Sequence, residues 1–302
     1  MKTSLECIPC LVRQALDVAR LASPDPAVHE TAVRDLLRRA SRADFHRPPP
    51  FLAQQVHRRL RTLTGGVDPY RDLKQRFTHL ALTLAEAWQE RLHRLRDPLE
   101  LAIRLAIAAN VIDLGAKTGL TEADLPRAFE QAVNAPLSGD VETFRSAVAA
   151  AGRILFLADN AGEIVFDRLL IGQIGPGKVT VAVRGAPVIN DATLEDAAEA
   201  GLTGFVEVLS NGSDAPGTIL EDCSAAFRRR FDAADLVVAK GQGNYETLAG
   251  ATRSIFFLFK VKCPVVAAHA GLPLGAHALL AHPAPPDTGH EHGAGERNGG
   301  GA

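Results

Sequence analysis

The sequence predicts an α/β protein in which an all-helical N-terminal half precedes a mostly parallel β-sheet with helices on both faces. Two observations lead to this prediction. Up to about residue 150, apolar residues recur at the three- and four-residue spacing of helices, whereas beyond it short β-rich runs alternate with helical segments. Near-continuous apolar strands joined by helical crossovers are typical of parallel sheets that are buried on both faces. The length of 302 residues and the 46% hydrophobic content are sufficient for one large or two ordinary domains.

The first half, residues 1–150, is expected to form helices that cover the functional site. Apolar residues at helical spacing mark a first segment from Leu5 to Ala19 and a second from about Asp68 to Leu95. Helix breaks are predicted at short segments that contain proline, glycine or a helix-capping residue. They lie at SPDP (23–26), RPPP (47–50), TGG (64–66), DP (97–98) and LSGD (137–140).

The second half, residues 151–278, is expected to form the α/β domain. Its β-rich runs predict five strands, at RILFLA (153–158), VTVAVR (179–184), FVEVLS (205–210), DLVVAK (235–240) and SIFFLFKV (254–261). Helices are expected near 162–172, 192–200, 217–231 and 245–249. The remaining residues, 279–302, are rich in proline and glycine and poor in apolar side chains, which predicts a disordered tail.

Charge and hydropathy argue against several classes of function. The net charge of −2 gives no general electrostatic attraction to nucleic acid or to an anionic membrane, so we expect neither as a partner. The longest apolar runs, LAIAAN and SIFFLF, are too short to span a bilayer, and the N-terminus lacks the apolar stretch of a signal peptide. We therefore expect a cytoplasmic protein. The sequence does not indicate its oligomeric state.

Polar clusters follow four of the five predicted strands. Because ligands of parallel sheets bind at the carboxyl ends of the strands, these loops should converge on one edge. Their oxygen donors and few cations suit a hard divalent metal ion together with an anion. Helix capping is the alternative for any single loop, but several such loops together favour a site. The clusters are DNAGE with Asp159, Asn160 and Glu163, RGAPVIND with Arg184, Asn190 and Asp191, SNGSDAPG, and KGQGNYE with Lys240, Gly241, Asn244 and Glu246.

Some side chains have two interpretations that the sequence leaves open. Glu163 is a candidate general base or an orienting residue, and a helix-start cap is the alternative. Asn110 and Asp113 lie one helical turn apart and form either a helix C-terminal cap or part of the substrate pocket. Cys7 and Cys10 form a C-x-x-C pair without a second pair to complete a zinc site, so we favour a structural or accessory role for them.

The segments ADNAGE, RGAPVINDAT and KGQGNYETL, with the N-terminal CIPC and ANVIDLG at 109–115, resemble the family once called domain of unknown function 89. Its members are metal-dependent damage-control phosphatases, and the match runs in order from residue 3 to about 275. The resemblance implies a Rossmann-like three-layer α/β/α domain after a helical region. It also implies that a divalent ion (Mn, Co, Ni or Mg) is held by Asp159, Asn160 and Asp191, and that Lys240 contacts the phosphate of a small phosphorylated metabolite.

The chemistry of these residue types agrees with phosphate-ester hydrolysis. Two carboxylates and an amide leave a divalent ion with a net positive charge, which attracts phosphate. Arg184 can add a bidentate guanidinium, and backbone N–H groups near Gly241 and Asn244, at a predicted helix start, favour an anion. The leading hypothesis is a metal-dependent phosphatase acting on compounds such as sugar phosphates or phosphopantetheine-like molecules.

Two other functions remain as alternatives. A Rossmann-like methyltransferase or nucleotide-binding enzyme predicts a glycine-rich loop after the first strand, where this chain has only Gly162. A non-catalytic metal-binding protein predicts a closed coordination shell without cationic phosphate ligands, and Lys240 argues against it.

Overall fold

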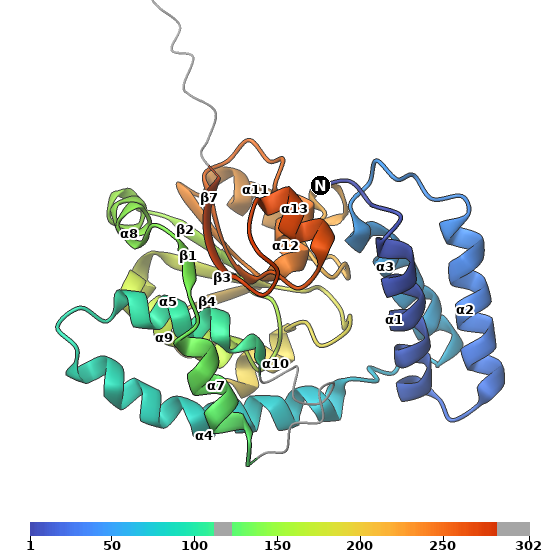
Figure 1. Cartoon of the computed structure of the whole chain (residues 1–302), viewed down its shortest axis with the longest axis horizontal. Coiled ribbons are helices and arrows are strands. Elements are labelled where there is room, and N and C mark those ends of the chain that lie inside the picture. Colours follow the sequence, from blue (N-terminus) through green and yellow to red (C-terminus); the bar gives the residue numbers. More distant parts are fainter. Residues whose placement is uncertain (112–122, 283–302) are drawn as a thin grey trace, which may run out of the picture.

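The strands of the computed structural model, which describes residues 1–111 and 123–282, form one seven-stranded sheet (Figure 1). The strand order is β1-β7-β6-β5-β2-β3-β4, and the five strands from β6 to β4 run parallel. β7 pairs antiparallel with β6 and parallel with β1, so the sheet is mostly parallel, as predicted. The strands are β1 Leu137–Gly139, β2 Ile154–Leu157, β3 Val179–Val183, β4 Glu207–Ser210, β5 Leu236–Lys240, β6 Ile255–Lys260 and β7 His277–His282.

Helices cover both faces of the sheet and form a three-layer α/β/α arrangement. In β2, Ile154 and Phe156 belong to one core, with residues of α4, α5, α7, α8 and α9, whereas Leu155 and Leu157 belong to the other, with residues of α11, α12 and α13. The helices are α4 Arg71–Arg94, α5 Leu99–Ala108, α7 Leu125–Val133, α8 Val141–Ala150, α9 Ile164–Ile174, α10 Leu194–Glu199, α11 Ala225–Ala233, α12 Gly241–Leu248 and α13 Pro264–Ala270. Burial of alternate side chains on opposite faces explains why the strands are apolar at every position.

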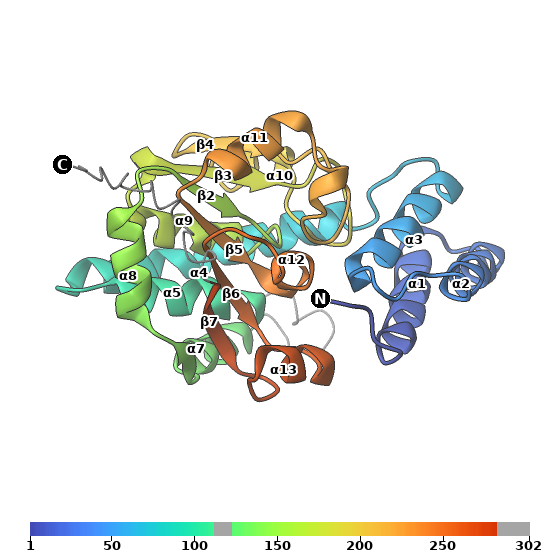
Figure 2. The same ribbon diagram turned by 90° about the horizontal axis from the view of Figure 1, so that it is seen from above.

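The first three helices form a separate unit at one side of the sheet (Figures 1 and 2). They are α1 Cys7–Ala22, α2 Pro26–Ala40 and α3 Pro49–Leu63, and they share a core of their own that includes Leu11, Leu36 and Leu60. Pro26 and Pro49 stand at the first helical positions, where a missing N–H costs no hydrogen bond. None of the helices in the described ranges combines the length and apolar character that a bilayer crossing requires.

All five predicted strands are present, and the two strands at one end of the sheet, β1 and β7, were missed. β1 lies at the predicted break LSGD, and it is only three residues long and ends in glycine. β7 corrects the prediction that the tail begins at residue 279, because residues 277–282 pair with β6 along their whole length. The helix expected at 217–231 begins only at Ala225, and the one expected at 245–249 begins at Gly241. The rest of the predicted tail, residues 283–302, lies outside the described residues.

Candidate active site

The loops after β2 and β3 bring the predicted metal ligands together at the carboxyl edge of the sheet. The backbone N–H of Ala192 donates to the carbonyl of Asp159 at 2.7 Å, and that of Ala161 donates to the carbonyl of Asn190 at 2.9 Å. Asn160 and Asp191 therefore lie opposite each other as an isolated antiparallel bridge. Because β2 and β3 are neighbours in the sheet, the loops that follow them lie side by side and pair at this bridge.

Ionisable side chains at this edge are buried, and acidic groups outnumber basic ones. None of the six is more than 8% exposed. Four carboxylates face two cations, which leaves two negative charges without a buried partner when all groups are ionised. The carboxylates belong to Asp159, Glu163, Asp167 and Asp191, and the cations to Arg184 and Lys240.

Asp159 lies close to two of the other carboxylates. Burial, followed by the nearby Asp191 and Glu163 carboxylates, raises the pKa of Asp159 to about 8. Burial also raises the pKa of Asp191, although Arg184 opposes the effect by donating from Nε to Asp191 Oδ2 at 2.6 Å. A cation placed beside these two carboxylates would restore their ionised forms.

Gly241 lets the start of α12 approach the Asp159 carboxylate. Gly241 has a φ of +79°, and a Cβ at this position would lie 1.9 Å from Asp159 Oδ2 and 2.1 Å from its Cγ. No side chain larger than hydrogen fits there without displacing Asp159. Gly241 was predicted as part of the phosphate-binding set, and the structure places it directly against the predicted metal ligand.

Glu163 is an ionised hydrogen-bond acceptor inside the site. Its Oε1 accepts from Asn160 Nδ2 at 2.7 Å and from Asn110 Nδ2 at 2.5 Å, while Lys240 Nζ lies 3.1 Å from Oε2. Burial alone would raise the pKa of Glu163, but Lys240 and these donors outweigh it and lower the pKa. Glu163 makes no capping bond to α9, so the helix-cap interpretation does not apply. Asn110 reaches the site from the segment after α5; Asp113 lies outside the described residues.

Lys240 is enclosed by two carboxylates, one just before α9 and one in its first turn. Its Nζ lies 2.7 Å from Asp167 Oδ1 as well as 3.1 Å from Glu163 Oε2, and its side chain is 1% exposed. Burial raises the pKa of Asp167 to about 7. The sequence analysis missed Asp167, although its position four residues after Glu163, on the same face of a helix, was an available signal.

Arg184 and Asn244 connect the loops after β3, β4 and β5. Arg184 Nη1 donates to Thr218 Oγ1 at 3.4 Å and to Asn244 Oδ1 at 3.3 Å. Its Nη2 lies 3.9 Å from Asp159 Oδ1 and is buried without a hydrogen-bond partner among the described residues. Asn244 donates both amide hydrogens to backbone carbonyls, of Lys240 at 2.7 Å and Ala158 at 3.2 Å. Its side chain therefore holds β2 against the start of α12.

Lys262, which follows β6, is a further cation that the sequence analysis missed. The residue is exposed, yet its charge opposes the rise in the pKa values of Asp159 and Asp191 and helps to lower the pKa of Glu163. The signal for it was available, because Lys262 follows the fifth predicted strand at the same edge of the sheet.

The C-x-x-C pair lies outside this cluster, at the start of α1. Cys7 and Cys10 are free thiols, and burial raises the pKa of Cys7. Among the described residues, no group of three or more His, Cys, Asp or Glu side chains has an arrangement that could hold a metal ion. A metal ion at the sheet edge would need donors of another kind beside the carboxylates, and the Asn160 amide is a candidate.

Comparison with known proteins shows the family of this chain. A family model described as the damage-control phosphatase ARMT1-like domain matches residues 3–278. The chain belongs to this family. A damage-control phosphatase of Pyrococcus horikoshii is 34% identical over 284 residues, covering 91% of this chain and 96% of that protein. A damage-control phosphatase of Archaeoglobus fulgidus is 34% identical over 281 residues, covering 91% and 97%.

A solved structure and a further relative resemble this chain over most of its length. The crystal structure of a DUF89 family protein from Pyrococcus horikoshii superimposes with a TM-score of 0.84 at 32% identity, covering 93% of this chain and 99% of that one. An uncharacterised protein of Methanocaldococcus jannaschii is 33% identical over 301 residues, covering 93% and 95%. The resemblance in sequence motifs and the mostly parallel three-layer fold are thus both confirmed.

Proposed function

We propose that the protein is a divalent-metal-dependent phosphatase that hydrolyses phosphate monoesters of small metabolites, including damaged or side-product compounds. Membership of the damage-control phosphatase family and the names of two relatives support phosphatase activity. The observation that carries the metal dependence is the burial of four carboxyl groups with only two cations at the carboxyl edge of the sheet, which gives an excess of two negative charges when all six groups are ionised. A divalent cation is opposite in sign to that excess and equal to it in size.

The residues at the edge fit such an ion. Asp159, Asn160 and Asp191 supply two carboxylates and an amide oxygen, the donor types that Mg²⁺ and Mn²⁺ accept. A bound divalent ion would polarise the phosphoryl oxygens and lower the pKa of a bound water. Asn160 donates from Nδ2 to Glu163, so its Oδ1 is left on the opposite side of the amide. We therefore assign to Glu163 the orientation of Asn160 rather than proton abstraction.

We assign phosphate recognition to two cations, Arg184 and Lys262, that have N–H groups without a hydrogen-bond acceptor among the described residues. The unpartnered Nη2 of Arg184 and the exposed ammonium of Lys262 can both donate to phosphoryl oxygens beside Asp159. Lys240 was expected to contact phosphate, but its ammonium is held by Glu163 and Asp167. We propose that Lys240 acts as their counter-ion. The substrate phosphate would thus lie on the Lys262 side of Asp159.

A metal add-back screen tests this function. Protein stripped of metal is assayed on an aryl phosphate and a panel of phosphorylated metabolites, with each divalent ion supplied separately. Activity should require an ion and should fall by at least a hundredfold in Asp159→Ala, because a missing ligand weakens both metal binding and charge stabilisation. Asp232→Ala, at an exposed position of α11, is the matched control and should retain activity. Activity without metal, or a fully active Asp159→Ala protein, would refute the proposal.

A further inference from the structure

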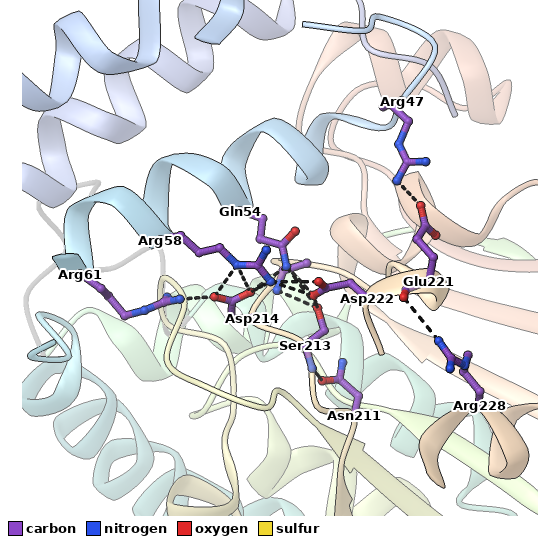
Figure 3. A network of polar contacts seen from close by, with 11 residues as sticks. Arg47, Gln54, Arg58, Arg61, Asn211, Ser213, Asp214, Glu221, Asp222 and Arg228 are labelled. Atoms are coloured by element: carbon purple, nitrogen blue, oxygen red, sulfur yellow. Dashed lines mark hydrogen bonds and ion pairs between the residues drawn. The ribbon is translucent and has the colours of Figure 1, made fainter. Parts of the chain in front are cut away.

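A polar network attaches the separate three-helix unit to the α/β domain (Figure 3). One face of α3 presents Gln54, Arg58 and Arg61 toward the loop after β4. Asp214 in that loop accepts from Gln54 at 2.7 Å and from Arg58 Nε at 2.8 Å, and it also pairs with Arg61. The Asp214 side chain is only 10% exposed, and these hydrogen bonds and ion pairs offset the desolvation penalty of its carboxylate.

Arg61 differs from its neighbours because it contacts two loops. Its Nη2 pairs with Asp214 after β4, and its Nη1 donates to the carbonyl of Pro187 after β3 at 2.7 Å. In contrast, the ion pairs of Arg58 go to Asp214 and Asp222, both of which follow β4. A guanidinium can hold two acceptors at a fixed separation, which a lysine ammonium does not do as rigidly.

Both loops that Arg61 contacts continue into the candidate site. The loop after β3 runs from Pro187 to the predicted ligand Asp191 and bends at Ile189, which has a φ of +47°. For a bulky β-branched residue this conformation is strained and persists only where neighbouring contacts impose it. The loop after β4 reaches Thr218, which donates to Asn244 at 2.8 Å, and Ser213 accepts from the backbone N–H of Gly185 at 2.7 Å.

We propose that Arg61 is a positioning residue that couples docking of the α1–α3 unit to metal binding at Asp159, Asn160 and Asp191. By holding Pro187 and Asp214 at once, it keeps Asp191 opposite Asn160. Coupling between two sites is reciprocal, so bound metal must also favour the docked unit. This inference rests on the proposed metal site and adds to it a residue on a helix outside the α/β domain.

Two measurements on Arg61→Ala test the coupling. Calorimetric titration with Mn²⁺ should give a Kd about 5- to 50-fold above that of the unaltered protein, within the usual range of coupling between sites. Limited proteolysis should cleave the 64–66 linker, which contains Gly65 and Gly66, and saturating Mn²⁺ should slow this cleavage in the unaltered protein. In Arg61→Ala the slowing by Mn²⁺ should be lost. Arg61→Lys, which keeps the charge, should weaken Mn²⁺ binding by an intermediate amount.

Arg59→Ala is the matched control. Arg59 lies on the same helix, but its ion pair is with Asp35 inside the three-helix unit, at 2.6 Å. It should leave the Mn²⁺ Kd within twofold. If Arg61→Ala lowers only thermal stability and leaves the Kd and the effect of Mn²⁺ on cleavage unchanged, the inference is wrong while the metal site stands. If no divalent ion binds the unaltered protein, both the inference and the proposed metal dependence are wrong.

Discussion

Replacing Gly241 with alanine should damage the candidate site without removing any functional group. The new Cβ would start 1.9 Å from Asp159 Oδ2, against an ordinary contact distance of about 3.5–4.0 Å, so carboxylate and helix must separate by roughly 1.5 Å. A φ of +79° adds about 1 kcal/mol for any residue with a Cβ. Relief of the overlap adds about 1–3 kcal/mol. The free energy of unfolding should therefore fall by about 2–4 kcal/mol.

Metal binding should fall as well, because a ligand displaced by this much leaves the range of metal–oxygen distances. We expect the Mn²⁺ Kd of Gly241→Ala to rise at least tenfold in calorimetry, and urea denaturation to report the change in stability. Gly250→Ala is the control, since a Cβ there meets nothing within 4 Å and Gly250 does not have a positive φ. Its stability should change by less than about 0.5 kcal/mol. A Gly241→Ala protein with unchanged stability and Kd would show that α12 does not begin against Asp159.

Three further predictions concern charged groups of the candidate site. Lys240→Met should reduce the free energy of unfolding by about 3–5 kcal/mol, because Glu163 and Asp167 then lose their buried counter-ion. Lys262→Met, at an exposed position, should leave urea denaturation unchanged. It should instead raise KM for phosphate esters and weaken inhibition by inorganic phosphate. Equal effects of the two variants in both assays would contradict the assigned roles. Because the folded-state pKa of Asp167, about 7, exceeds its ordinary value of 3.8, its contribution to stability is complete below pH 4 and is lost as the pH rises toward 7. In the metal-free protein, Asp167→Asn should therefore make the free energy of unfolding fall less steeply across this pH range. If the urea midpoints of the variant and of the unaltered protein change in parallel with pH, the raised pKa of Asp167 is wrong.

The clustering of Asp159, Asn160 and Asp191 could be predicted from sequence, because they lie in loops that follow apolar runs typical of buried strands. Parallel topology brings these loops to one edge of the sheet, whereas the metal-binding role was implied by the family resemblance and stays a prediction. Asp167 was harder to find, because it lies within a helix whose other turns are apolar and its partner Lys240 is 73 residues away. The close approach of Gly241 to Asp159 depends on backbone conformation, which residue types alone do not specify.

The network around α3 could not have been predicted from spacing. Gln54, Arg58 and Arg61 recur at four and three residues on one helix face, a pattern that is typical of a solvent-exposed surface. Their partners Asp214 and Asp222 lie more than 150 residues along the chain, in a loop without regular periodicity. Only the packing of the three-helix unit against the sheet domain decides which face of α3 is covered. The strand β7 was missed for a related reason: its histidines at both ends and the following proline-rich segment obscure its apolar centre.

The two outermost strands of the sheet are both short. β1 has three residues and β4 has four, whereas the six-residue strands β6 and β7 both lie inside the sheet and are paired on each side. β4 begins with Glu207, whose carboxylate pairs with Arg230 of α11 at 2.7 Å. Short edges and charged edge residues resist the addition of strands from other chains. The longest hydrogen-bonding templates are thus inaccessible to a second molecule, which should keep the folded protein from aggregating edge to edge at high concentration.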